Sequence, residues 1–168
     1  MMRNVTLIGM PGSGKSTVGR LLAQKLSYAF LDVDPLIVAA YGGRTLQQVL
    51  DELGTEKVLD LEADVIAGLD REHTVLAPGG SAVLREKGIA HLKALGPVVY
   101  LSLPCSALEK RLGNLATRGV TLAPGQTLQD LYDYRLPFYE KYADLTVDAG
   151  GPSLEDTAAR VLAALGEL

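Results

Sequence analysis

A glycine-rich segment near the start of the chain has the residue types and the spacing to bind phosphate groups. It reads Gly9-Met-Pro-Gly-Ser-Gly-Lys-Ser-Thr17 and fits the pattern G-x-x-x-x-G-K-[ST]. An apolar run at 5–8 precedes it, and residues 18–26 after it have helical spacing. Glycines let backbone N–H groups approach phosphate oxygens, and the helix that follows points its free N–H groups at the same oxygens. The alternative is a glycine-rich turn that only caps a helix, and the flanking strand and helix argue against it.

Two side chains of this phosphate loop (residues 9–17) could act directly on a bound polyphosphate. Lys15 supplies a full positive charge that can reach the β- and γ-phosphates. The Ser16 hydroxyl group can be a ligand of Mg²⁺. The segment therefore predicts a magnesium–nucleotide site.

Two carboxylates follow the second apolar run, in Phe30-Leu-Asp-Val-Asp34. Alternate residues of an extended segment point the same way, so Asp32 and Asp34 could face one cleft. One could hold water on Mg²⁺, and the other could accept a proton from a substrate hydroxyl group. The alternative is a solvated strand end that leads into a turn at Pro35.

A glycine pair follows the third apolar run, in Pro78-Gly-Gly-Ser81. The backbone N–H groups of Gly79 and Gly80 could bind a polar substrate. The alternative is a simple turn with Ser81 as the N-cap of the next helix.

Three arginines are candidates for anion binding. Arg118 lies in the segment 113–126, which has no helical or strand periodicity and is either a functional lid or disordered. Arg111 lies before this segment, near the end of a short predicted helix. A mobile arginine that arrives on closure can neutralise charge on a γ-phosphate and exclude water. Arg135 lies among aromatic residues and could bind a carboxylate with two hydrogen bonds. The alternative for all three is an ordinary surface position, with Arg135 paired to Asp133 or Glu140.

These candidates lie between segments that alternate between strand and helix patterns. Strands are expected at 4–8, 29–31, 74–77, 98–102 and 145–147, and helices at 16–26, 46–53, 57–69, 82–95, 128–142 and 153–165. Several strands are continuously apolar, which is typical of a parallel sheet covered on both faces. The pattern predicts an α/β fold with ligands beyond the carboxyl ends of the strands.

Composition narrows the classes of function. The chain has 168 residues, a length that favours a single domain spanning residues 1–168. Hydrophobic residues make up 48% and charged residues 21% of it. A net charge of −4 argues against a nucleic-acid partner, and Cys105 as the only cysteine excludes an intrachain disulfide. No apolar run has the length of a membrane span, and the start does not resemble a secretory signal. We expect a cytoplasmic protein without a membrane or nucleic-acid partner.

Together these motifs resemble the shikimate kinases, small members of the nucleoside monophosphate kinase-like P-loop group, over nearly the whole chain. The resemblance implies a three-layer α/β/α sandwich with a five-stranded parallel sheet in the order 2-3-1-4-5, a P-loop kinase fold with a mobile lid. It implies transfer of a phosphoryl group from ATP to a hydroxyl group of shikimate. We expect a monomer that binds ATP, Mg²⁺ and a small hydroxylated acceptor.

The resemblance also assigns roles to the matching residues. ATP would be bound by Arg111, Arg118 and the phosphate-loop residues Gly12, Ser13, Gly14, Lys15, Ser16 and Thr17. Mg²⁺ would be held by Ser16 and, through water, by Asp32. Shikimate would be bound by Asp34, Gly79, Gly80 and Arg135. Lys15, Asp34 as base and Arg118 as lid arginine would be catalytic.

The chain departs from the family pattern on the acceptor side. The family shows G-E-x-x-F-R-x-x-E, and this chain reads Gly54-Thr-Glu-Lys-Val-Leu-Asp-Leu-Glu62, so Leu59 replaces a substrate-binding arginine. Ser81 replaces the third glycine after strand three, and the lid reads Arg118-Gly-Val-Thr-Leu122 in place of Arg-Pro-Leu-Leu. Losing an arginine contact worth about 1.5–3 kcal/mol would weaken shikimate binding by roughly tenfold to over a hundredfold.

Three alternatives to a shikimate kinase therefore stay open. A diverged kinase could phosphorylate another small hydroxy acid, which Leu59 favours. A nucleotide-binding regulator could lack transfer activity, although Lys15 and Asp34 are both present. A nucleoside monophosphate kinase would need more arginines around its acceptor phosphate.

Overall fold

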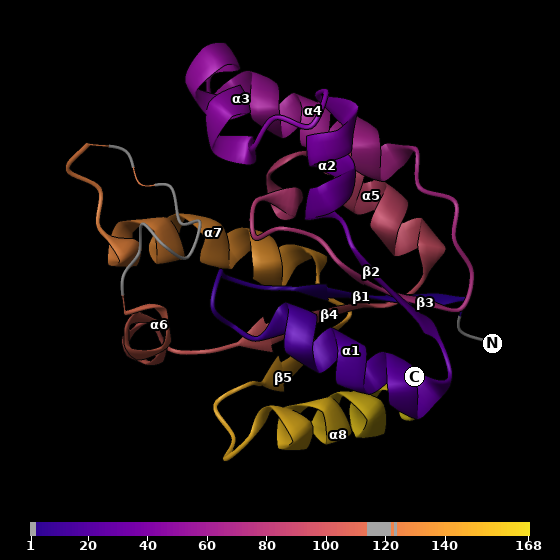
Figure 1. Ribbon diagram of the computed structural model, residues 1–168. Coiled ribbons are helices and arrows are strands. Elements are labelled where there is room, and N and C mark those ends of the chain that lie inside the picture. Colours follow the sequence, from indigo (N-terminus) through magenta and orange to yellow (C-terminus); the bar gives the residue numbers. More distant parts are fainter. Residues whose placement is uncertain (1–2, 114–121, 123) are drawn as a thin grey trace.

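The five strands form one parallel sheet, in the order β2-β3-β1-β4-β5 (Figure 1). The computed structural model describes residues 3–113, 122 and 124–168. The strands are β1 (Asn4–Ile8), β2 (Ala29–Asp32), β3 (Thr74–Ala77), β4 (Val98–Ser102) and β5 (Leu145–Asp148). Every residue of the inner strands β1 and β3 is buried, as expected for a parallel sheet covered on both faces. The strand order that the family resemblance implied is confirmed.

Helices cover both faces of this sheet. They are α1 (Lys15–Leu26), α2 (Asp34–Ala40), α3 (Leu46–Leu53), α4 (Thr55–Ala67), α5 (Glu86–Leu95), α6 (Cys105–Leu112), α7 (Leu128–Tyr142) and α8 (Leu154–Leu165), with a 3₁₀ turn η1 (Ala82–Leu84). Helices α1 and α8 pack together on one face, and α5 and α7 lie on the other (Figure 1). The three-layer sandwich is confirmed. A membrane crossing would need a longer and more apolar helix than any in the described part of the chain.

Two predicted elements differ from the structure. The segment after β2 is not extended, because Val33 has helical angles and Asp34 begins α2. Pro35 in the first turn, with an acidic residue before it, favours a helix start there. The predicted helix 82–95 is broken into η1 and α5, because Arg85 has extended angles (φ −129°, ψ 120°).

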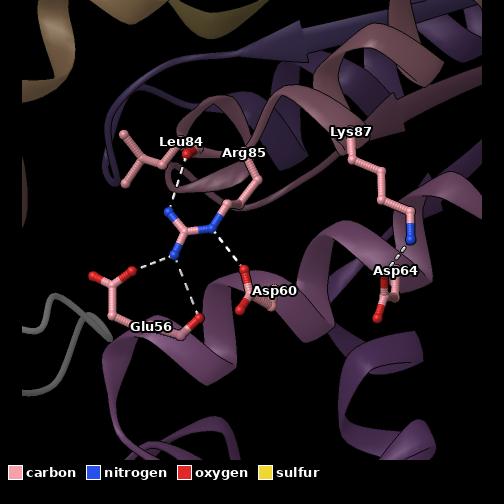
Figure 2. Close-up of polar contacts among 6 residues, drawn as sticks. All are labelled: Glu56, Asp60, Asp64, Leu84, Arg85 and Lys87. Carbon is pink, nitrogen blue, oxygen red and sulfur yellow. Dashed lines mark hydrogen bonds and ion pairs between the residues drawn. The ribbon is translucent and has the colours of Figure 1, made fainter.

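Arg85 at this break ties α5 to α4. Its guanidinium group points at α4, where Nε donates to Asp60 at 2.8 Å and Nη2 pairs with Glu56 (Figure 2). Lys87 on α5 pairs with Asp64, which lies one turn after Asp60 on α4 (Figure 2). These contacts hold α4 beside the segment that follows β3.

Candidate functional site

The phosphate loop connects β1 to α1 at the carboxyl edge of the sheet. Gly12 and Gly14 have φ of +84° and +95°, in the left-handed region that favours glycine. A Cβ atom on Gly12 would lie 2.9 Å from Cδ2 of Leu112, so the loop backbone packs closely on α6. The Ser13 hydroxyl group is buried and has no hydrogen-bond partner within the described residues. Such a loop leaves polar groups for a ligand to satisfy.

Lys15 begins α1 and reaches back across the loop. Its Nζ donates to the carbonyl oxygens of Gly9 at 2.8 Å and Met10 at 2.9 Å. Burial lowers the pKa of Lys15 to about 8, although the nearby Asp34 opposes this shift. A polyphosphate would give the ammonium group stronger acceptors than two neutral carbonyl oxygens.

A cavity of about 440 Å³ opens beside the phosphate loop, large enough for a nucleoside. Arg111 lines it and ties two segments together, because its guanidinium group donates to the carbonyl oxygens of Ser13 at 3.2 Å and Ala149 at 2.9 Å. The full lining consists of Gly12, Gly14, Thr17, Arg111, Gly151, Pro152, Ser153 and Leu154.

The β5–α8 connection is therefore a wall of this cavity that the sequence analysis missed. Its glycine pair, Gly150 and Gly151, is separated by one residue from the last strand of a parallel sheet, and that position is a signal that could have identified it.

The residues predicted to hold Mg²⁺ are Ser16 and Asp32. Asp32 Oδ1 accepts a hydrogen bond from the Asp34 amide at 3.2 Å. Within residues 3–113, 122 and 124–168, no three His, Cys, Asp or Glu side chains form a metal-binding group. This set fits Mg²⁺, because that ion keeps several waters, takes phosphate oxygens and needs only one or two protein ligands.

The structure brings together four residues predicted for the acceptor side, and we call this predicted cluster of Asp34, Gly79, Gly80 and Arg135 the acceptor pocket. A Cβ atom on Gly79 would lie 3.2 Å from Asp34 Oδ1. A Cβ atom on Gly80 would lie 3.0 Å from Arg135 Nη1 and 3.2 Å from the Gly9 carbonyl oxygen. A carboxylate, a guanidinium group and the phosphate loop therefore meet at this glycine pair.

The two charged groups of the acceptor pocket have unusual environments. Burial raises the pKa of Asp34, and the negative charge of Asp32 raises it further, while Lys15 lowers it. Arg135 Nε is buried without a hydrogen-bond partner in the described part of the chain. Among the described residues Arg135 forms neither of the alternative ion pairs, with Asp133 or with Glu140, and Asp133 accepts instead from Gln129. Arg135 thus keeps a donor for an acidic ligand.

Glu62 on α4 is a further polar residue of this region, to which the sequence analysis gave no role. Its side chain is 6% exposed and accepts from the Ser81 hydroxyl group at 2.9 and 3.1 Å. Burial raises the pKa of Glu62 to about 7. Ser81 stands at the N-cap position of η1, as the alternative had it, but its side chain makes no capping bond. The signal for Glu62 in the sequence was that it keeps the last acidic position of the family pattern over 54–62.

The remaining predicted residues are less informative. Leu59 is partly buried on α4, one turn before Glu62. Arg118 and most of the predicted lid 113–126 lie outside the described residues.

Comparisons with known proteins point to one family. Residues 11–166 match the family profile described as shikimate kinase. The chain is 32% identical to shikimate kinase of Thermodesulfovibrio yellowstonii, over 96% of this chain and 94% of that protein. It is also 33% identical to human threonine synthase-like 1 over 97% of its own length, but spans only 22% of that protein. Shikimate kinase from Acinetobacter baumannii, solved in complex with shikimate, superposes with a TM-score of 0.89 at 32% identity, covering 99% of this chain and 94% of that one.

Proposed function

The chain belongs to the shikimate kinase family, and we propose that it transfers the γ-phosphoryl group of ATP to a hydroxyl group of shikimate, giving shikimate 3-phosphate. Family membership makes the protein a phosphotransferase that acts on a hydroxyl group. The structure with the TM-score of 0.89 is a complex with shikimate, which supports this acceptor.

One juxtaposition carries the proposal. The Gly9 carbonyl oxygen of the phosphate loop and Arg135 Nη1 of the acceptor pocket lie within 3.2 Å of the same Cβ position on Gly80. An acceptor whose carboxylate binds Arg135 would therefore lie beside a phosphate bound by Lys15. Bringing acceptor and donor into contact in this way accounts for much of the catalysis of phosphoryl transfer.

On the donor side, the backbone N–H groups of residues 12–17 bind the phosphates, and Lys15 exchanges its carbonyl contacts for phosphate oxygens. The base of ATP occupies the cavity beside Arg111. Ser16 and Asp32 would hold Mg²⁺. When bound, the ion offsets charge on the β- and γ-phosphates.

On the acceptor side, Asp34 accepts the proton of the reacting hydroxyl group. The hydroxyl oxygen forms its bond to the γ-phosphorus as the bond between that phosphorus and the β–γ bridging oxygen breaks, and ADP leaves with that oxygen. The raised pKa of Asp34 makes it a stronger base than an exposed aspartate. Arg135 holds the acceptor carboxylate, and Arg118 remains the predicted lid arginine.

Leu59 favours a second candidate, a kinase for another small hydroxy acid. Its side chain gives α4 an apolar surface where the family pattern has an arginine. ADP release should be measured with Mg·ATP and a panel of hydroxy monocarboxylates, for the wild type and for Leu59→Arg. The proposal expects shikimate to be the best wild-type acceptor and Leu59→Arg to lower its KM. Wild-type turnover of another acid, without any gain for shikimate in Leu59→Arg, would favour the second candidate.

A further inference from the structure

Ser81 and Glu62 form a buried polar pair beside the acceptor pocket. The Ser81 hydroxyl group lies 2.9 and 3.1 Å from the two carboxylate oxygens of Glu62. No lysine or arginine in the described ranges forms an ion pair with this carboxylate. A buried carboxylate without a paired cation depends strongly on each hydrogen bond that it accepts. The hydrogen bond from Ser81 therefore helps to determine the charge and the orientation of the Glu62 carboxyl group.

The pair borders the reacting end of the acceptor pocket. A Cβ atom on Gly79 would lie 3.2 Å from Asp34 Oδ1 and 3.6 Å from Glu62 Oε2. The two carboxyl groups thus flank one backbone position, and the charge of Asp34 raises the pKa of Glu62. The charged or titratable groups that act on Glu62 from other elements are Asp34 of α2, and Arg135 and Tyr139 of α7.

Two departures from the family pattern meet at this pair. Ser81 supplies a hydroxyl group where the pattern has glycine, and Leu59 lies one turn before Glu62 on the same side of α4. Helix α4 thus carries the Glu62 carboxylate at this pair and, one turn earlier, an apolar side chain in place of the arginine of the family pattern. Among the described residues, Arg135 is the cation that we assign to an acidic acceptor, because the proposed function assigns Lys15 to the phosphates.

Taking the proposed function as the starting point, we propose that Ser81 is a positioning residue that holds Glu62 to accept a hydrogen bond from a second hydroxyl group of the acceptor. Together with Leu59, the pair restricts acceptors to small polyhydroxy acids with one carboxylate. A dianionic acceptor would bring its second charge toward Asp34 and Glu62, where repulsion opposes binding.

The fold should tolerate removal of the Ser81 hydroxyl group. Arg85 and Lys87 independently tie the segment after Ser81 to α4, through Asp60 and Asp64 among others (Figure 2). Ser81→Ala therefore removes one donor without detaching the helix that carries Glu62.

The test compares the wild type with Ser81→Ala, Ser81→Thr, which keeps the hydroxyl group, and Lys87→Ala, which loosens the same two segments away from the pocket. The kinetic constants for acceptor and ATP are measured between pH 6 and 8.5. We expect Ser81→Ala to raise the acceptor KM about 3- to 10-fold, the loss of one hydrogen bond, with little change in the KM for ATP. Ser81→Thr should recover most of this loss, and Lys87→Ala should match the wild type.

The pH profile separates positioning from a structural role. Ser81 stabilises the charged form of Glu62, so Ser81→Ala should move the acidic limb of kcat/KM for the acceptor to higher pH. An unchanged limb and an unchanged acceptor KM in Ser81→Ala, or efficient wild-type turnover of a phosphorylated hydroxy acid, would overturn this inference while leaving the proposed function intact. A wild-type enzyme that phosphorylates no hydroxy acid would overturn both.

Discussion

The hydroxyl group of Tyr139 donates a hydrogen bond to the carbonyl oxygen of Gly80 at 2.7 Å. This contact joins α7, which carries Arg135, to the loop after β3, which borders the phosphate loop. Tyr139 is 1% exposed and stacks on Tyr100, with 5.1 Å between the ring centroids. Because burial raises its pKa, the hydroxyl group keeps its proton and remains a donor. The distance between Arg135 and Gly80 thus depends on a buried, rigidly held side chain.

Tyr139→Phe should weaken acceptor binding without abolishing phosphoryl transfer. The Gly80 carbonyl oxygen loses its donor, which costs about 1–3 kcal/mol of stability for a buried group. We expect the acceptor KM to rise several-fold while the KM for ATP changes little, measured by steady-state kinetics with thermal unfolding alongside. Equal losses for both substrates would show that Tyr139 supports the whole fold and not the acceptor side.

Lys15→Ala should abolish most phosphoryl transfer. The substitution removes the charge that we assign to the β- and γ-phosphates, so kcat should fall on the order of 100-fold or more. Lys25→Ala is the matched control, because Lys25 is an exposed lysine on the same helix. Near-normal turnover in Lys15→Ala would contradict the assigned role.

Arg135→Lys should raise the acceptor KM roughly 10- to 100-fold, because an ammonium group cannot reproduce a bidentate contact worth about 1.5–3 kcal/mol. Arg3→Lys, at an exposed ion pair with Glu72, is the control. Retention of the wild-type KM for every acidic acceptor would rule out carboxylate binding by Arg135.

Glu62 should make folding stability depend on pH. Its pKa is about 7 in the folded protein and near the ordinary 4.5 when unfolded, so only the folded state holds this proton between those values. Stability should therefore fall as pH rises from about 4.5 to 7, by about 3 kcal/mol from this group. Because the raised pKa of Asp34 acts in the same direction, the test is the difference between the wild type and Glu62→Gln in denaturant titrations. Parallel pH profiles would contradict the assignment.

Local sequence predicted the elements that depend on local interactions. The glycine pattern, the apolar run before it and the helical spacing after it predicted β1, the phosphate loop and α1, and all three are present. The continuously apolar strands indicated a parallel sheet, which is confirmed, although its order came from the family resemblance. Asp34 was wrongly placed in an extended segment, because two alternating acids look the same whether a strand continues or a helix begins at Pro35.

The site depends on contacts that no local pattern encodes. Ser81 and Glu62 are 19 residues apart, and their pairing requires α4 to pack beside the loop after β3. Arg111 and the β5–α8 connection meet only because β4 and β5 are neighbours in the sheet. The roles of the predicted residues stay predictions, and kinetics on the variants will decide them.

The most direct test of the account is phosphorus NMR of the wild-type protein incubated with Mg·ATP and shikimate. The account predicts that the γ-phosphate signal is replaced, one for one with ADP, by a phosphomonoester signal on shikimate, and that Lys15→Ala shows neither product. ATP that stays intact, or that yields only inorganic phosphate with shikimate unchanged, would contradict it.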